Sequence, residues 1–246
     1  MIQNLIEKSS KIVALTGAGV SADSGIPDFK TTDELWEHEV SRAEANSIWF
    51  FKDEPRRFWE LYRDTFALDT TFEPNGFHYF LAGLEHNHDI TIATQNVDGL
   101  HTAAGSSDVI EFHGSTQRLV CIQRRCRKQA PGGLYRKYRY VDFAHKTMPQ
   151  CPACGGVLKP DVSLFGEGVS GFGAARDLVI EADLLIVAGT SLRVGPFNEL
   201  PIFAQVYNPG AAQVWINNED TPPEEYDFTE IFSGGIADFT AKHGTL

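Results

Sequence analysis

Four cysteines stand in two close pairs, the type of arrangement that binds a metal ion. Cys121-x4-Cys126 is followed after 24 residues by Cys151-x2-Cys154. Two such pairs on tight turns suit four thiolates that converge on one tetrahedral ion, and Gly155 supplies the conformational freedom that the second turn needs. Because four cysteines fill the coordination shell, the spacing predicts a structural zinc and leaves no open position for a catalytic water.

A glycine-rich segment has the spacing of a phosphate-binding turn. Gly17-x-Gly19-x-x-Ala22 follows an apolar run and matches the relaxed dinucleotide fingerprint. A plain strand–turn–helix junction would look similar. A nicotinamide dehydrogenase would also carry an acidic residue at the end of a second strand, about 20 residues on. Asp33, Glu34 and Glu37 lie near that distance but follow no apolar run, which counts against hydride transfer.

Two further apolar runs end in residues that can do polar chemistry. Gln95, Asn96 and Asp98 follow the run at 90–93, and His113 follows the run at 109–112. Side chains alternate along extended backbone, so Asn96 and Asp98 are expected to share a face. A histidine can act as a base near neutral pH, although His113 alone also suits a simple turn residue.

The elements that must position these groups alternate between strand and helix. Continuous apolar runs predict buried parallel strands at residues 11–15, 90–93, 109–112, 184–188 and 214–216. Helical patterns lie between several of them, for example at 77–85 and 174–181. Open α/β sheets bind ligands at the carboxyl ends of their strands. The pattern therefore predicts an α/β doubly wound parallel sheet with its site at that edge.

Two segments interrupt the alternation and read as inserts. Residues 30–75 contain many aromatics at helical spacing, which predicts a helical insert whose rings pack in a core. Residues 115–160 hold all four cysteines, and 118–146 carry nine Lys and Arg against one Asp. Residues 118–146 of the second insert therefore have a net charge of +8, and the rest of the chain has a net charge of −20.

Composition bounds the class of protein. The chain has 246 residues, 42% of them hydrophobic, and a formal net charge of −12, enough apolar residues for one large domain with a smaller insert. The acidic balance argues against general binding of nucleic acid or of membrane surfaces. No run approaches the roughly 18 apolar residues of a membrane span, and the amino terminus does not resemble a secretory signal. We expect a monomeric, cytoplasmic protein.

The motifs, taken in order, resemble those of the sirtuins, the NAD-dependent protein deacylases. Residues 17–30 resemble the first sirtuin signature. Further blocks follow in the family's order at 94–101, 112–114, the cysteine pairs and 189–192, with 165–167 and 216–217 also similar. The resemblance implies a Rossmann-like NAD-binding part formed by 1–30, 76–114 and 161–246. It also implies a smaller zinc-binding and helical domain formed by the inserts 31–75 and 115–160.

The resemblance also implies a reaction and its residues. An acyl group moves from a lysine of a protein or peptide to the ADP-ribose of NAD, the co-substrate, and nicotinamide is released. The implied catalytic residues are His113 as base, with Asn96 and Asp98. The implied NAD contacts are Gly17, Ala18, Gly19, Ala22, Asp28, Phe29, Lys30, Gln95, Asn96, Val97, Asp98, Gly189, Thr190, Ser191, Asn217, Gly235 and Ile236. The implied substrate-peptide contacts, mainly through backbone, are Val162, Ser163, Phe165, Gly166 and Glu167.

Three positions depart from the family pattern. Lys30 stands where Arg is usual and loses the planar bidentate fork; Lys30→Arg is expected to leave activity equal or higher. Ser163 replaces an apolar residue, which can shift the preference for the acyl chain. Members that favour acidic acyl groups use Tyr-x-x-Arg, but here Thr65 stands three residues after Tyr62. Neutral acyl groups such as acetyl are therefore expected over succinyl.

Two other functions use the same residues differently. Mono-ADP-ribosyl transfer or NAD hydrolysis would need the same NAD site. A non-catalytic protein that binds NAD or nucleic acid would use the basic insert, where Tyr135, Tyr138 and Tyr140 interleave with the cations. The complete set of His113, Asn96 and Asp98 argues against this last possibility.

Overall fold

The computed structural model describes residues 1–27, 36–66, 68, 70–129, 134–219 and 221–244. The helices, 3-10 turns included, are α1 (Ile2–Lys8), η1 (Ala18–Ser24), α3 (Arg42–Ala45), α4 (Ile48–Asp53), α5 (Pro55–Phe66), α6 (Gly76–Leu84), α7 (Leu100–Ala103), α8 (Arg124–Lys128), η3 (Tyr140–Phe143), α9 (Phe172–Val179), η4 (Phe197–Glu199), α10 (Leu200–Tyr207) and α11 (Ile236–His243). The strands are β1 (Lys11–Thr16), β2 (Asp89–Thr94), β3 (Val109–Glu111), β4 (Gly114–Cys121), β5 (Arg136–Arg139), β6 (Lys159–Val162), β7 (Leu184–Ala188), β8 (Ala212–Asn217) and β9 (Glu230–Ser233). Within these ranges, every helix is too short or too polar to cross a bilayer.

The larger sheet has six parallel strands in the order β3-β2-β1-β7-β8-β9. Counted in chain order, this is the arrangement 3-2-1-4-5-6 of dinucleotide-binding folds. Each of the five predicted apolar runs coincides with one of these strands, except that Phe112 of the run 109–112 lies just after β3, and this confirms the predicted doubly wound sheet. The sixth strand, β9, was not predicted, because its residues alternate between half-buried and exposed and form no apolar run.

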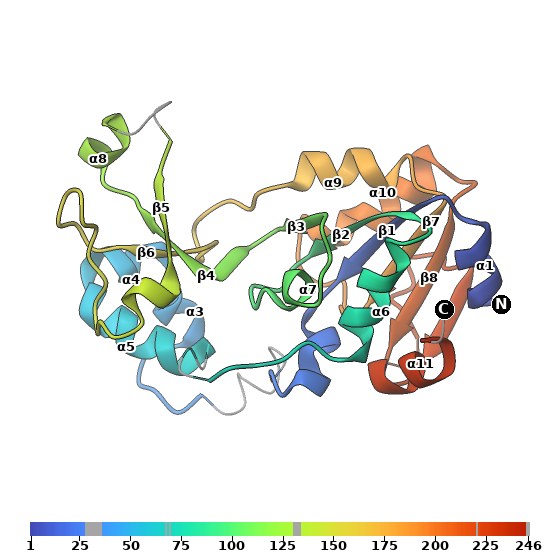
Figure 1. The fold of residues 1–246 in the computed structure, drawn as a ribbon, viewed down its shortest axis with the longest axis horizontal. Coiled ribbons are helices and arrows are strands. Elements are labelled where there is room, and N and C mark those ends of the chain that lie inside the picture. Colours follow the sequence, from blue (N-terminus) through green and yellow to red (C-terminus); the bar gives the residue numbers. More distant parts are fainter. Residues whose placement is uncertain (28–35, 67, 69, 130–133, 220, 245–246) are drawn as a thin grey trace.

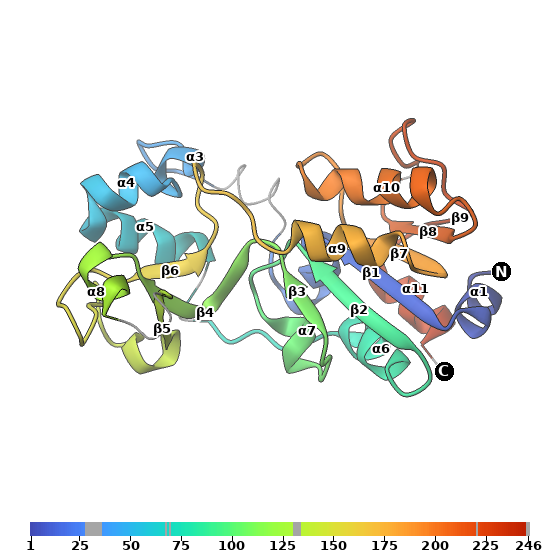
Figure 2. The same ribbon diagram turned by 90° about the horizontal axis from the view of Figure 1, so that it is seen from above.

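Side-chain alternation along β1 divides the core between the two faces of the sheet. Ile12 and Ala14 pack with the residues of α1, α6 and α11. Val13 and Leu15 pack with those of α9 and α10 on the opposite face. Figures 1 and 2 show these two helical layers on either side of the sheet. A strand covered on both faces must be apolar throughout, which explains the continuous runs.

A second lobe combines the two inserts. Its antiparallel sheet has the order β5-β4-β6, and α3, α4 and α5 lie against it (Figure 2). Phe58, Trp59 and Tyr62 of α5 are buried in one cluster with three of the cysteines. The prediction that the aromatics of residues 30–75 pack in a core is right for these three residues. It is wrong for Trp49 of α4, which is 64% exposed.

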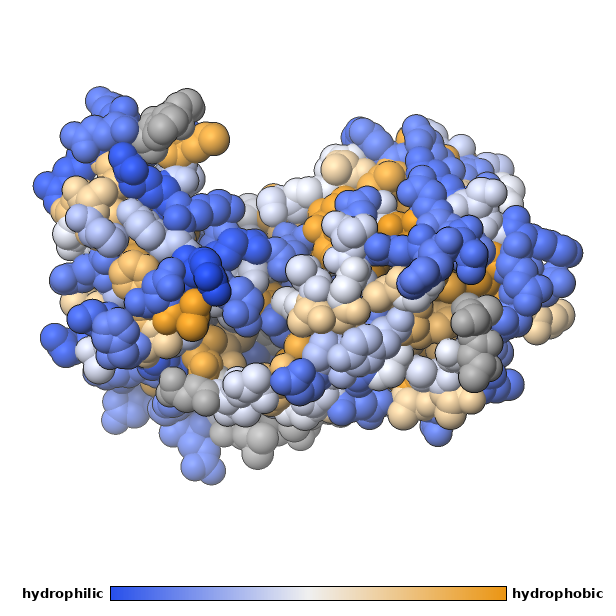
Figure 3. Space-filling view, viewed as in Figure 1, coloured by the Kyte–Doolittle hydropathy of each residue, from blue (hydrophilic) through white to orange (hydrophobic). Residues whose placement is uncertain are grey.

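The two lobes are joined where β3 of the large sheet runs into β4 of the small one. Only Phe112 and His113 separate these strands. Arg118 of β4 donates to Glu111 of β3 at 2.6 Å and to Asp161 of β6 at 3.0 Å, which ties the two sheets together. The strand arrows of the large sheet point toward the second lobe (Figure 2), and the outline is notched between the lobes (Figure 3).

Candidate active site and metal centre

The glycine turn lies at the switch point of the sheet, where the strand order reverses between β1 and β7. The Gly19 amide donates to the Gly189 carbonyl at 2.8 Å. A Cβ on Gly19 would lie 2.8 Å from Gly189 Cα, and one on Gly17 would lie 2.7 Å from Thr190 Cβ. Side chains at these positions would therefore force the two turns apart. Backbone without side chains therefore lies at the carboxyl ends of two central strands, where a pyrophosphate group could approach it closely. The helix expected after these glycines is the 3-10 helix η1.

Asn96 and Asp98 meet at a third side chain, that of Ser21. The Asn96 amide donates to Ser21 Oγ at 3.1 Å and to the Gly17 carbonyl at 3.1 Å. Ser21 Oγ donates to Asp98 Oδ2 at 2.8 Å, and the Leu100 amide donates to Oδ1 at 2.9 Å. Both N–H groups of Asn96 are thus used, which leaves its side-chain oxygen to accept a bond from a ligand. The shared face expected from alternation is present.

A chain of hydrogen bonds connects the ends of β2, β7 and β8. Thr190 Oγ1 donates to Gln95 Oε1 at 2.9 Å, and Asn217 Nδ2 donates to the Thr190 carbonyl at 2.9 Å. Three blocks that are distant in sequence therefore form one continuous polar rim. This leaves the Gln95 NH2 group as a donor that can face a ligand on the rim.

His113 is held at the junction between the lobes with a defined tautomer. Its carbonyl accepts a bond from the Ser163 amide at 2.8 Å, and its Nδ1 lies 3.0 Å from the Gln95 carbonyl. A carbonyl can only accept, so Nδ1 carries a proton, and in the neutral form of the ring the lone pair is on Nε2. Gly114 makes the turn possible, because its φ is 78° and a Cβ there would lie 1.9 Å from the Asp161 carbonyl.

Behind the site lie two buried histidines that the sequence reasoning did not single out. The rings of His78 and His101 are 4.8 Å apart, and His101 Nε2 lies 2.9 Å from the Thr16 hydroxyl. Burial, and secondarily His78, lower the pKa of His101 to about 3. Burial also lowers the pKa of His78. Both rings are therefore neutral at physiological pH and can be part of the packed floor of the site.

The predicted peptide-binding segment is fastened to its surroundings. The Phe165 amide donates to the Asn46 carbonyl and the Ile48 amide donates to the Phe165 carbonyl, each at 3.0 Å. Lys159 Nζ lies 2.8 Å from Glu167 Oε2, which also accepts a bond from the Leu164 amide. Burial lowers the pKa of Lys159, and Glu167 opposes that effect. The segment thus has a set shape before any peptide binds.

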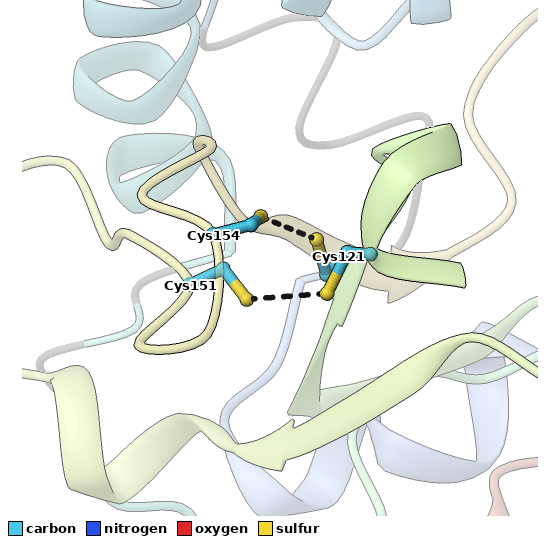
Figure 4. Close-up of side chains that lie close together, drawn as sticks. Cys121, Cys151 and Cys154 are labelled. Carbon is cyan, nitrogen blue, oxygen red and sulfur yellow. Dashed lines mark hydrogen bonds between the residues drawn. The ribbon is translucent and has the colours of Figure 1, made fainter. Parts of the chain in front are cut away.

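The four cysteines converge, as their spacing predicted. The sulfurs of Cys121 and Cys154 are 3.5 Å apart and those of Cys126 and Cys151 are 3.8 Å apart, and all four lie within 4.8 Å of one another (Figure 4). A disulfide would require about 2.05 Å. Zinc–sulfur bonds of about 2.3 Å in a tetrahedron separate the sulfurs by about 3.8 Å. The cluster therefore fits zinc, and its four thiol ligands leave no position for water.

The surroundings of the cluster stabilise thiolate at one of the four positions. Burial acts to raise the pKa of Cys151, but hydrogen bonds from the Tyr138 hydroxyl and from the Ala153 and Cys154 amides lower it to about 6. Burial raises the pKa of Cys121. Gly155, with a φ of 71°, makes the turn that brings the second pair around, as expected.

Other predicted NAD contacts are less clearly placed. Asp28, Phe29 and Lys30 lie outside the described residues. Gly235 caps α11, whose Ala237 amide donates to Asp23 at 3.1 Å. The side chain of Ile236 is buried in the core, so the predicted contact with adenine can involve only its backbone. Ala18 and Ala22 lie in η1, which follows β1, and Val97 and Ser191 lie in the loops after β2 and β7.

Ser21 has a place in the site that could not be predicted from the sequence. This residue stands within the first signature block, between the glycines and Asp28. Its hydroxyl bridges two predicted catalytic residues that lie 75 and 77 positions away. The signal that the sequence offered was a serine within the glycine-rich segment. The partners of its hydroxyl are set by the fold, so they could not be read from the sequence.

Comparison with known proteins gives a consistent result. The Sir2 family model matches residues 17–196. A NAD-dependent protein deacetylase of Chromobacterium violaceum is 40% identical over 207 residues, which cover 82% of this chain and 80% of that protein. A NAD-dependent protein deacetylase of Bacillus subtilis is 40% identical over 229 residues, 89% of this chain and 88% of that one.

Solved structures agree with the fold. A structure that addresses the basis of sirtuin substrate affinity superposes with a TM-score of 0.84 at 30% identity, covering 98% of this chain and 96% of that one. A complex of a Sir2 homologue with NAD superposes with a TM-score of 0.83 at 32% identity, covering 98% and 91%. Family motifs, fold and sequence identity agree over most of the length, and this chain belongs to the Sir2 family.

Proposed function

We propose that this enzyme removes acyl groups from lysine side chains of proteins, transfers them to the ADP-ribose of NAD and releases nicotinamide. The observation that carries the proposal is the geometry of His113. Its Nδ1 is committed to the carbonyl of Gln95, the residue that precedes Asn96, at 3.0 Å, which leaves Nε2 as the nitrogen that can act as a base. The relatives named NAD-dependent protein deacetylase support the same reaction.

The residues of the chain supply binding and proton transfer. Bound NAD supplies a ribose whose bond to nicotinamide can break. His113 Nε2 takes the proton from a ribose hydroxyl, and the Gln95 carbonyl at Nδ1 stabilises the resulting imidazolium. The Asn96 side-chain oxygen accepts from ribose or from an ordered water, and Asp98 accepts from the nicotinamide carboxamide. The rim of Gln95, Thr190 and Asn217 contacts phosphate and the second ribose.

The second substrate is an acylated lysine in a protein or peptide. Solved relatives include a Sir2 complex with a p53 peptide and NAD, and one with an acetylated peptide. In this chain, residues 162–167 form the corresponding wall, whose shape is fixed by the bonds of Phe165 and Glu167. We propose that main-chain pairing along this wall presents the acyl-lysine to His113.

We also propose a separate role for each part of the chain. Residues 1–30, 76–114 and 161–246 bind NAD, and the inserts 31–75 and 115–160 form the smaller domain. Separate hydrophobic clusters in the two lobes support this division. We also expect a monomer that acts in the cytoplasm.

One experiment tests the proposal against the two alternatives. The protein is incubated with NAD and an acetyl-lysine peptide, and the products are identified by mass. Acyl-ADP-ribose with free nicotinamide is expected. ADP-ribosylated protein or free ADP-ribose without deacylation would instead indicate ADP-ribosyl transfer or NAD hydrolysis, and no consumption of NAD would indicate a binding protein. His113→Ala should abolish turnover, whereas His86→Ala, at an exposed histidine after α6, serves as the matched control.

A further inference from the structure

An aromatic hollow lies beside the predicted peptide wall and is not used by the reaction described above. It has a volume of about 660 Å3, within the range of small ligand sites, about 300–1,000 Å3. Six of its lining residues come from the segment before α3, from α3, from α4 and its N-cap Ser47, and from the peptide wall: Val40, Ala43, Ser47, Trp49, Phe50 and Phe165. Trp49 is 64% exposed and Phe165 is 56% exposed, so two large rings face solvent at one place.

The hollow is continuous with the wall. Ser47 and Phe165 form a parallel bridge, secured by the Phe165 amide on the Asn46 carbonyl and by the Ile48 amide on the Phe165 carbonyl. The Trp49 ring covers Gly166, where a Cβ would lie 2.2 Å from the indole. A peptide lying along residues 162–167 would therefore pass directly beside the Trp49 ring.

The charge around the hollow is negative. Three of its lining residues are acidic, Glu44, Asp53 and Glu54, against one cation, Lys52. Arg57 lies 3.8 Å from Glu54 and adds one positive charge. It also lies 3.7 Å from Glu39, whose negative charge offsets it, so the net charge around the hollow stays negative. An exposed indole with carboxylates around it suits a cationic side chain, because the ring attracts the cation and the apolar stem covers the ring.

We propose that this hollow binds an arginine or lysine side chain of the protein substrate, close in sequence to the acyl-lysine. This inference rests on the proposed deacylase function and adds a preference for sequence to it. Main-chain pairing alone recognises any extended peptide. The Trp49 hollow would select sites with a neighbouring cation, and arginine is the better ligand because its planar guanidinium stacks on aromatic rings.

The test is a peptide series in which a single arginine moves from four residues before to four residues after the acetyl-lysine on an alanine background. One or two adjacent positions should raise kcat/KM about fivefold over alanine, as expected for a partly exposed cation–π contact with added charge attraction. The gain should fall as salt rises. Anisotropy measurements of peptide binding, made in parallel, give the same ratio without turnover.

Variants of the hollow test whether it causes the preference for arginine. In Trp49→Ala the arginine-to-alanine ratio should fall to less than half of its wild-type value, and Trp49→Phe should retain more of it. Asp53→Asn combined with Glu44→Gln should lower the ratio and its salt dependence. Tyr79→Ala removes a similarly exposed ring from α6 in the other lobe and should leave the ratio unchanged. Because Trp49 is mostly exposed, its loss opens no cavity in the core, and melting temperatures check the fold of each variant.

Two results would overturn the inference: a flat series, or a preference for arginine that is undiminished in Trp49→Ala. Failure of the deacylase proposal gives a different result, because the alanine-background peptide would then yield no acyl-ADP-ribose at all. The binding ratios would still decide whether the hollow takes a cation.

Discussion

The ammonium group of Lys159 lies 2.8 Å from Glu167 Oε2, and the same carboxylate oxygen accepts a bond from the Leu164 amide. The side chain of Lys159 is only 6% exposed, whereas charged groups are rarely buried unless they are paired. This pair therefore sets the shape of the turn that carries Phe165 and Gly166, both predicted to contact the peptide.

Lys159→Met should raise the KM for the acyl-lysine peptide several-fold and leave the KM for NAD nearly unchanged. It should also lower the free energy of unfolding by about 2 kcal/mol, less than the ~3–5 kcal/mol of a fully buried pair because Glu167 keeps contact with solvent. The matched control is Lys11→Met, which breaks the exposed pair with Glu181 and should cost less than about 1 kcal/mol. Equal increases in both KM values would contradict a role specific to the peptide.

Ser21→Ala should separate Asn96 from Asp98 without disturbing the sheet. The variant removes the only side chain that bonds to both residues among those described. The loss of about 1.5 kcal/mol, at the lower end of the usual range for a hydrogen bond to a charged group, corresponds to slightly more than tenfold in kcat/KM. The control is Ser24→Ala. Ser24 lies in η1 like Ser21, but its hydroxyl accepts a hydrogen bond from Asn75. Wild-type kinetics in Ser21→Ala would show that the bridge does not matter.

Removal of the zinc should unfold the second lobe and spare the large sheet. The cysteines lie in one hydrophobic cluster with α4 and α5, so loss of the ion should loosen the helices as well as residues 115–160. Hydrogen exchange after treatment with a chelator should rise in β4 and α5, with β1, β7 and β8 as internal references. Cys154→Ser should weaken zinc retention, measured by metal analysis. Unchanged exchange in β4 after complete loss of zinc would refute a structural role.

Much of this arrangement could be predicted from the sequence, because the sheet is covered on both faces. Each strand of that kind is a continuous apolar run, and each chemical block follows one run, so the blocks meet at one edge. The edge strand β9 escaped prediction because its residues are half-exposed and alternate. Cysteine spacing was informative for a related reason, since two tight turns already bring each pair together.

Contacts between distant segments could not be predicted in the same way. The role of Ser21 depends on partners from the β2 end, and the ring contact between His78 and His101 joins α6 to α7. Lys159 would be assigned to the surface by residue type alone, yet it is buried. Trp49 would be assigned to the core, yet it is exposed. In each case, tertiary packing overrides the preference of the residue type.

The buried His101 should make stability depend on pH. Its pKa in the folded protein is about 3, lowered first by burial and then by His78, against about 6.5 in an unfolded chain. Between these values the unfolded state binds more protons, so the free energy of unfolding rises with pH up to about 6.5 and is lost as pH falls toward 3. One histidine contributes a slope of up to about 1.4 kcal/mol per pH unit.

His101→Gln should therefore flatten the dependence of stability on pH between about 6.5 and 4.5, by up to one proton. Denaturant unfolding of the wild type and the variant at several pH values measures the two slopes. Their difference cancels the loss of zinc in acid, which both proteins share. A variant with the wild-type slope would mean that His101 is protonated in the folded protein.

The preference for the acyl group depends on the residues of α5 around Tyr62. Tyr62 is buried in the aromatic cluster of α5, and its hydroxyl lacks a hydrogen-bond partner within the described residues. Burial raises its pKa, which keeps the phenol neutral. Thr65 bonds to the Leu61 carbonyl, and the Arg63 guanidinium donates to the carbonyls of Ala144 and Lys146. The Arg of a Tyr-x-x-Arg pair is thus absent, and the nearest Arg of α5 is committed elsewhere.

A succinyl group would have to bring its carboxylate into the site that binds the acyl group without that cation, and burying an unpaired charge is costly. The kcat/KM for a succinyl-lysine peptide should therefore be at least about tenfold lower than for the matched acetyl-lysine peptide, since 1.4 kcal/mol suffices for this factor. A butyryl peptide, similar in length but neutral, separates charge from size and should be cleaved faster than the succinyl peptide. If succinyl were removed as fast as acetyl or faster, another cation would have to pair with the succinyl carboxylate.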